Sequence, residues 1–216
     1  MADQPTPPPH SSPAFEAVVF DFDGTLVATR VADEAAVAEL IASDPSAEAG
    51  AEVFWAHEGE PIVTRIELAW PGRGAAVLPL FERQGPPRCY PGVIPLLRRL
   101  RSRGLRMAVV SSRRRTPLDA GLVSTRLLPY FQVVVALEDV REPKPSPEGL
   151  VLAMRRLGVD AAGTLYVGDN PLDLEAGHRA GVTVWRAVWG VTPASPNGAV
   201  LVRTPAELGR RLAGAG

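Results

Sequence analysis

The sequence predicts an α/β fold, an open parallel sheet with helices on both faces, into which a small helical module is inserted. Three observations lead to this prediction. The apolar run over residues 17–20 has the pattern of a buried strand, residues 31–85 contain helical patterns only, and strand and helix patterns alternate from residue 91 onward. Strands that alternate with helices imply parallel pairing, because the chain must cross back over the sheet between them.

The first strand follows a segment of different composition. Residues 1–14 are rich in proline and polar side chains, which predicts a flexible tail. The residues 17–20 that follow are all apolar and predict a fully buried strand. This strand ends in the acidic segment Asp21-Phe22-Asp23-Gly24-Thr25, where the glycine indicates that the chain turns.

The inserted module shows helical patterns that are separated by proline and glycine breaks. These patterns cover residues 31–44, 51–59, 62–70 and 75–85. We therefore expect a catalytic core made of residues 15–28 and 87–216 and a helical cap made of residues 29–86.

The second half of the chain supplies the remaining strands and helices. The first predicted helix covers residues 93–103 and is closed by Gly104, and the second covers roughly residues 118–127. The third is capped by Ser146 and begins at Pro147. The predicted strands cover residues 105–112, 131–137, 164–169 and, after another short helix, 182–189.

Composition limits the classes of partner. The chain has 216 residues, of which 46% are hydrophobic and 22% charged, and its formal net charge is −1. This balance creates no overall field that would attract nucleic acid or anionic lipid, and we expect the run Arg113–Arg115 to be solvated helix surface. The single cysteine, Cys89, fits a reducing compartment. No apolar stretch is long enough to span a bilayer, so we expect no membrane partner and take the cytoplasm as the default location. We also expect no nucleic-acid partner and a monomer or homodimer.

Polar residues gather where predicted strands end. Asp21, Ser111 and Asp169 each follow a strand, and Lys144 lies in the loop after a fourth strand. Ligands of open α/β sheets bind beyond the carboxyl ends of the strands. These four side chains should therefore face one crevice.

The acidic segment after the first strand has two interpretations. Asp21 and Asp23 could form only an acidic turn. Alternatively, Asp21 is a nucleophile that attacks phosphorus, and Asp23 donates a proton to the leaving alcohol and later accepts one from water. Phe22 between them would then point into the core. Gly24 and Thr25 would contribute to substrate binding.

A divalent metal would reduce the repulsion between phosphate and aspartate, and carboxylate ligands suit Mg²⁺. Asp169 is a candidate metal ligand, although it could instead cap a helix. Asp173, one helical turn later, could orient Asp169 or Lys144. Ser111 and Ser112 could hold a phosphoryl oxygen, or they could be simple turn residues. Lys144 is the only lysine among 23 basic residues. It is either a chance survivor in an exposed loop or a residue that arginine cannot replace, since an ammonium and a planar guanidinium are not interchangeable in a tight site.

In their order along the chain, DFDGT, VVSS, EPKPSPE and VGDNPLD resemble the four motifs of the haloacid dehalogenase superfamily of phosphohydrolases. YPGVIPLLRRLRSRG and EAGHRAGV look like the phosphoglycolate phosphatase and β-phosphoglucomutase branch, which has a Rossmann-like core and a helical cap. The resemblance implies a Mg²⁺-dependent phosphatase that hydrolyses a small phosphorylated metabolite, such as a phosphoglycolate-like phosphomonoester. The resemblance implies catalytic roles for Asp21, Asp23 and Lys144, and a substrate-binding role for Ser111. It implies that Asp21, Asp169 and the backbone carbonyl of Asp23 bind the metal. Asp173 would support these residues.

Other functions stay open at this point. A phosphomutase would use the same aspartyl phosphate but exclude water, and a phospho-acceptor signalling domain would also combine acidic residues, a hydroxyl and a lysine. A non-catalytic interaction protein that retains the fold is a third alternative. The cap candidates for substrate contact match no specificity motif, and we expect each of them to be solvated surface. They are Arg30, His57, Arg65 and Arg73.

Overall fold

A computed structural model describes residues 15–190 and 199–214. The predicted flexible tail, residues 1–14, lies outside this range. Within the described residues, every helix is too short or too polar to cross a lipid bilayer.

The core is a six-stranded sheet in which every neighbouring pair is parallel, as predicted. Its order is β5-β4-β1-β6-β7-β8, so the first strand of the chain lies in the middle. Phe20 pairs with Val109 on one side and with Val167 on the other, which places the carboxyl ends of the three central strands level with one another. The strands are β1 (Ala17–Phe20), β4 (Arg106–Val110), β5 (Val133–Val135), β6 (Thr164–Gly168), β7 (Thr183–Ala187) and β8 (Val200–Val202).

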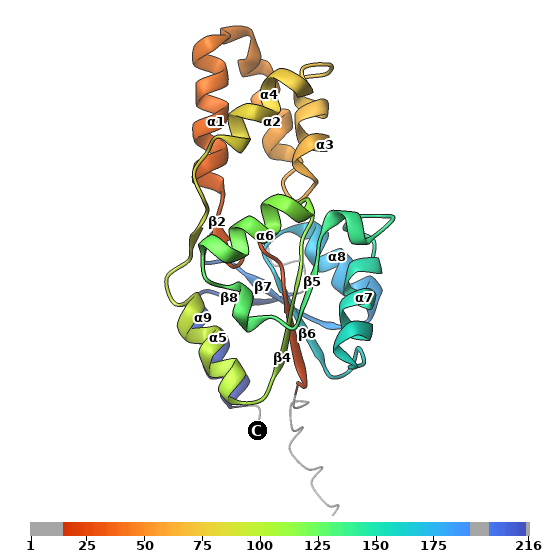
Figure 1. Cartoon of the computed structure of the whole chain (residues 1–216). Helices are drawn as coiled ribbons and strands as arrows, with labels where there is room; N and C mark the ends of the chain where they lie inside the picture. Colours follow the sequence, from red (N-terminus) through yellow and green to blue (C-terminus); the bar gives the residue numbers. More distant parts are fainter. Residues whose placement is uncertain (1–14, 191–198, 215–216) are drawn as a thin grey trace, which may run out of the picture.

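Helices cover both faces of this sheet (Figure 1). Side chains of a strand alternate between the faces, so Val18 and Phe20 belong to one hydrophobic cluster whereas Ala17 and Val19 belong to the other. The first cluster includes leucines of α5 (Val93–Ser102), α6 (Arg115–Ser124) and α9 (Pro205–Ala213). The second includes residues of α7 (Glu148–Leu157) and α8 (Pro171–Ala180).

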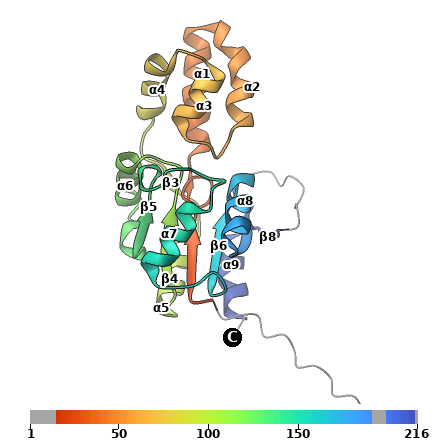
Figure 2. The ribbon, with the colours of Figure 1, turned by 90° about the vertical axis from the view of Figure 1, so that its right-hand side faces the viewer.

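The inserted helices form a unit with its own hydrophobic cluster, centred on Phe54, Ile66 and Trp70. This unit lies beyond the carboxyl ends of the strands, and in Figure 2 the red arrow of β1 points towards it. Its helices are α1 (Arg30–Ser43), α2 (Glu48–Ala56), α3 (Ile62–Ala69) and α4 (Gly74–Glu82). Short 3₁₀ turns lie at η1 (Pro45–Ala47), η2 (Leu128–Tyr130) and η3 (Leu137–Asp139).

Several elements differ from the sequence-based prediction. The chain enters and leaves the helical unit through an antiparallel ribbon of β2 (Val27–Ala28) and β3 (Arg88–Cys89), too short to show a strand pattern. The strand β8 and the helix α9 follow the last predicted element. Helix α6 begins at Arg115, earlier than expected, and α7 begins at Glu148, one residue later than Pro147. Ser146 still accepts a hydrogen bond from the Glu148 N–H, at 3.3 Å.

Candidate active site

The carboxyl edge of the central strands brings three carboxylates together. Asp21 follows β1, Asp169 follows its neighbour β6, and Asp173 lies in the first turn of α8. Each offers an oxygen, and these oxygens all lie within 4.8 Å of one another. We call Asp21, Asp169 and Asp173 the acidic cluster.

Lys144 lies against this cluster and is buried. Its Nζ donates to Asp21 Oδ1 at 2.5 Å and to Asp173 Oδ1 at 2.7 Å. Asp173 also accepts from the Tyr166 hydroxyl at 2.6 Å and, through Oδ2, from the Asn170 N–H at 3.0 Å. Both oxygens of Asp173 are thus engaged by protein donors, which suits an orienting role better than a place among metal ligands.

Burial controls the electrostatics of the cluster. It raises the pKa of Asp21 to about 8, although the Lys144 ammonium opposes this shift. Burial, followed by the charges of Asp21 and Asp173, also raises the pKa of Asp169 well above its ordinary value. Burial lowers the pKa of Lys144, but the Asp173 and Asp21 carboxylates more than compensate, so its pKa lies well above the ordinary value. The raised pKa values of Asp21 and Asp169 reflect negative charge that one ammonium compensates poorly, and a hard divalent cation suits both this charge and the oxygen donors.

Gly24 and Thr25 lie directly against Asp169. Gly24 has a positive φ of 76°, and a Cβ at this position would lie 2.2 Å from Asp169 Oδ2. The buried Thr25 hydroxyl donates to Asp169 Oδ1 at 3.1 Å. These contacts hold the carboxylate in place, and the predicted contribution of Gly24 and Thr25 to substrate binding stays a prediction.

Asp23 lies outside the acidic cluster and binds Arg113. Nε of Arg113 donates to Asp23 Oδ2 at 3.0 Å, and Nη2 donates to Oδ1 at 2.6 Å. Phe22, between the two aspartates, is fully buried in the core, which confirms the expected orientation. From the sequence we expect the run Arg113–Arg115 to be solvated surface. This expectation is wrong for Arg113, because its side chain turns inward to bind the Asp23 carboxylate. Arg113 lies two residues after Ser111, close to a strand end, and this position was the one sequence signal that it belongs to the site.

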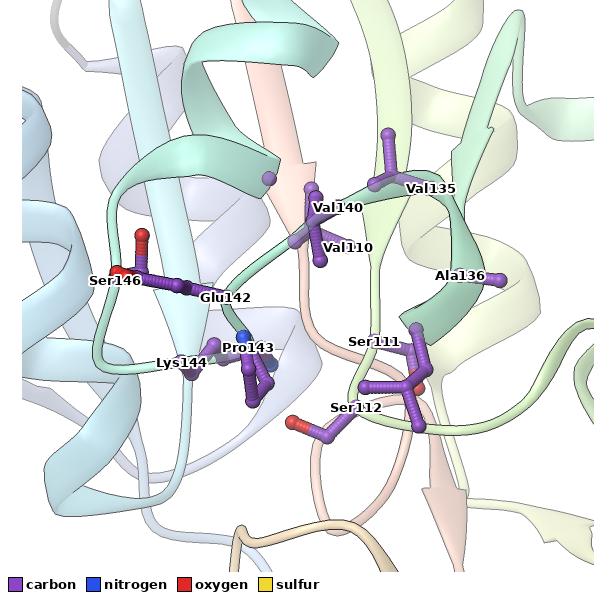
Figure 3. A pocket seen from close by; sticks show the side chains of 12 residues that line it. Val110, Ser111, Ser112, Val135, Ala136, Val140, Glu142, Pro143, Lys144 and Ser146 are labelled. Atoms are coloured by element: carbon purple, nitrogen blue, oxygen red, sulfur yellow. The ribbon is translucent and has the colours of Figure 1, made fainter.

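Ser111 and Ser112 lie on the loop after β4. Together with Lys144 they line a pocket between this loop and the one that carries the lysine (Figure 3). The Ser111 hydroxyl is buried and accepts from the Arg113 N–H at 3.1 Å. The Ser112 hydroxyl is also buried, points towards the lysine-bearing loop, and has no hydrogen-bond partner among the described residues.

The helical unit contacts the core close to this site. The Asn170 side chain donates from Nδ2 to the Glu58 carbonyl at 2.7 Å, and a Cβ at Gly59 would lie 2.5 Å from Asn170 Oδ1. The same Asn170 caps α8 by accepting from the Leu172 N–H at 3.0 Å. Sequence reasoning missed this asparagine, because its partner is a backbone carbonyl far away in the chain.

The four cap candidates occupy different environments. The expectation of solvated surface is wrong for Arg65, which is 8% exposed, forms an ion pair with Asp33 at 3.0 Å and stacks on Phe54. The exposed Arg30 pairs with Glu34 and Glu58, Arg73 pairs with Asp44, and His57 contacts the Val53 carbonyl.

Comparison with known proteins agrees with this geometry. Residues 82–187 match the family model described as haloacid dehalogenase-like hydrolase. The chain is 32% identical over 207 residues to a phosphoglycolate phosphatase of Synechococcus elongatus, covering 89% of this chain and 95% of that protein. It is 27% identical over 184 residues to the pyrophosphatase PpaX of Oceanobacillus iheyensis, covering 82% and 86%.

A solved structure supports the same relationship. The crystal structure of CbbY from Rhodobacter sphaeroides in complex with phosphate superimposes with a TM-score of 0.71 at 25% identity, covering 90% of this chain and 96% of that one. The strand order, the site at the carboxyl edge of the sheet and the match to a relative over nearly its whole length lead to one conclusion. The chain belongs to the haloacid dehalogenase-like hydrolases and is an enzyme of that family.

Proposed function

We propose that the protein is a Mg²⁺-dependent phosphatase that hydrolyses a small phosphorylated metabolite, a phosphoglycolate-like phosphomonoester, through an aspartyl phosphate on Asp21. The observation that carries this proposal is the position of Lys144, whose ammonium lies between Asp21 and Asp173 at 2.5 and 2.7 Å. A buried cation there neutralises the nucleophile and the phosphoryl group that approaches it. The relative named phosphoglycolate phosphatase supports the phosphomonoester class, and the relative named pyrophosphatase supports only the broader expectation of phosphate hydrolysis.

The covalent step uses both aspartates of the segment after β1. An oxygen of Asp21 attacks phosphorus while the bond from phosphorus to the leaving oxygen breaks, and Asp23 supplies the proton that this oxygen takes up. A water molecule then attacks the aspartyl phosphate after giving a proton to Asp23, and the bond between phosphorus and Asp21 breaks. Ser111, together with backbone N–H groups of its loop, holds a phosphoryl oxygen during both steps.

The carboxylates of Asp21 and Asp169, with the backbone carbonyl of Asp23, would hold Mg²⁺. When bound, the cation supplies positive charge that reduces the repulsion between phosphate and carboxylate. Residues 29–86 act as the cap over this site, with the contact between Glu58 and Asn170 as one place where the cap meets the core. Action in the cytoplasm and a monomeric or homodimeric state stay predictions.

The test compares Asp21→Asn with the wild-type enzyme. We expect Mg²⁺-dependent release of phosphate from phosphoglycolate and from an aryl phosphate by the wild type, and a loss of roughly ten-thousandfold in kcat for the variant. Asp119→Asn makes the same chemical change at a half-exposed carboxylate of α6 and serves as control. Retained turnover by folded Asp21→Asn protein would contradict the nucleophile assignment.

Release of phosphate to water also separates the phosphatase from the alternatives. A phosphomutase would return the phosphoryl group to a sugar, and a phospho-acceptor domain would release phosphate slowly. Sustained turnover of phosphoglycolate in the absence of any sugar acceptor is the result that we expect.

A further inference from the structure

Arg113 holds the proposed acid/base in a two-point ion pair. Its Nε and Nη2 donate to the two oxygens of Asp23, at 3.0 and 2.6 Å. The backbone of Arg113 is itself fixed, because its N–H donates to Ser111 Oγ at 3.1 Å and its carbonyl accepts from the Leu137 N–H at 3.0 Å. The guanidinium is therefore presented rigidly by the loop after β4.

This arrangement hinders proton transfer by Asp23. Both oxygens of Asp23 accept from the planar guanidinium, so the carboxylate is oriented towards Arg113 and only the outer lone pair of each oxygen stays free. The side chains of Arg113 and Asp23 are 28% and 35% exposed, so the pair is accessible to solvent and to a dissolved ligand. Opening the pair would free both oxygens of Asp23, and another anion that binds Arg113 would open it.

The surroundings keep Arg113 charged. Burial lowers the pKa of its guanidinium, but the carboxylates of Asp23, Asp33 and Asp21 more than offset this, so the pKa lies above its ordinary value. Asp33 belongs to the first turn of α1, in the helical unit, and forms its own ion pair with Arg65. Arg113 is thus a permanent cation at the border between the core and the helical unit.

We propose that Arg113 is a positioning and specificity residue that releases Asp23 when a second anionic group of the substrate binds its guanidinium. This inference rests on the proposed function and narrows its substrate class. The substrate would carry, beside the transferred phosphoryl group, a carboxylate or a second phosphate, both of which match the two-point geometry of arginine. Recognition of the substrate and positioning of the acid/base would then be one event.

The experiment compares substrates with and without the second anion. Phosphoglycolate carries a carboxylate, pyrophosphate carries a second phosphate, and phenyl phosphate carries neither. Each is assayed with saturating Mg²⁺ using wild-type enzyme, Arg113→Gln, Arg113→Lys and Arg114→Gln. Arg114 is the adjacent arginine, 59% exposed and paired only loosely with Glu138 at 3.5 Å, so Arg114→Gln is the matched control.

The decisive quantity is a ratio: kcat/KM for the better two-anion substrate divided by kcat/KM for phenyl phosphate. We expect Arg113→Gln to lower this ratio about tenfold to hundredfold. The loss should lie mainly in KM, and Arg113→Lys should recover part of it, since an ammonium retains the charge without the planar geometry. Arg114→Gln should keep the wild-type ratio. Phosphoglycolate and pyrophosphate distinguish the two kinds of second anion.

An equal loss on all three substrates, in folded protein, would overturn the inference, because a purely structural role has no reason to discriminate between them. If Arg113→Gln does not fold, the same kcat/KM ratio is measured with Arg113→Lys. A lowered ratio would support the inference, and an unchanged ratio would overturn it. Failure of the proposed function is a different result: the wild-type enzyme itself would release no phosphate from any of the three substrates.

Discussion

Replacing Lys144 by methionine tests the electrostatic basis of the site. Methionine has a similar length and flexibility but no charge, so the substitution keeps the volume and removes the ammonium. In the wild type this ammonium contacts Asp21 at 2.5 Å and Asp173 at 2.7 Å, and it is 8% exposed. The variant leaves these buried carboxylates without the cation that both of them contact.

The magnitude follows from this burial. Removing one partner of a buried ion pair costs about 3–5 kcal/mol, because the remaining charge is desolvated and unpaired. For a protein of this size each kcal/mol shifts the unfolding midpoint by about 2–4 °C, so the midpoint should fall by about 6–20 °C. Turnover should also be abolished. Lys144→Arg should lose most of its activity as well, since a planar guanidinium does not fit a site shaped for an ammonium.

The pH dependence has a definite sign. The pKa of Asp21 is raised to about 8 in the folded protein, from an ordinary value of 3.8, so the folded state binds more protons between these values. Lys144 lowers this pKa, so its removal raises the pKa further. The metal-free variant should therefore be destabilised less near pH 6, where Asp21 is protonated with or without Lys144, than above about pH 8, where Asp21 of the wild type ionises beside Lys144 and the variant has no cation for that charge.

Urea titration in the presence of a chelator, followed by circular dichroism and tryptophan fluorescence, measures the free energy of unfolding. The control is Arg179→Met, which removes an exposed cation whose partner, Glu175, is also exposed, and its effect should stay under about 1 kcal/mol. If Lys144→Met were as stable as this control at both pH values, the ion pairs would not carry the energy that their burial implies.

Three further predictions concern the surroundings of the site. Gly24→Ala should abolish activity, because the new Cβ would lie 2.2 Å from a carboxylate oxygen of Asp169. Gly72 also has a positive φ but faces open space, so Gly72→Ala should cost only about 1–2 kcal/mol of stability and serves as the control. Asn170→Ser keeps an acceptor for the helix cap but cannot reach the Glu58 carbonyl, and steady-state kinetics should show KM raised about two- to tenfold with kcat less affected. Calorimetric titration should show tighter Mg²⁺ binding as the pH rises towards about 8, because protons on Asp21 compete with the metal; an affinity independent of pH would contradict this.

Local patterns predicted much of the fold. The apolar run 17–20 corresponds to β1, and the alternation after residue 91 corresponds to the parallel strands and helices that follow it. These elements were predictable because burial on both faces of a parallel strand requires a continuous apolar run. Strand β8 and helix α9 were missed, although Thr204 caps α9 through a hydrogen bond from the Glu207 N–H. A single capping residue is only a weak local signal.

Part of the site was predictable for a related reason. Asp21, Ser111 and Asp169 each follow a strand pattern, and parallel strands end at the same edge of the sheet. The structure brings Asp21 and Asp169 together in the acidic cluster and places Lys144 against Asp21, as the prediction required. The sequence also marked Lys144 through composition, as its only lysine.

The sequence by itself therefore determined the kind of fold and the strand ends at which reactive groups gather, because both depend on short-range patterns of burial. Only the tertiary structure decided which charges meet. It paired Asp23 with Arg113, buried Arg65 against Asp33, and joined Asn170 to the Glu58 carbonyl. These contacts join residues from 32 to 112 positions apart, and the strength of each depends on burial and on angles that no local pattern encodes.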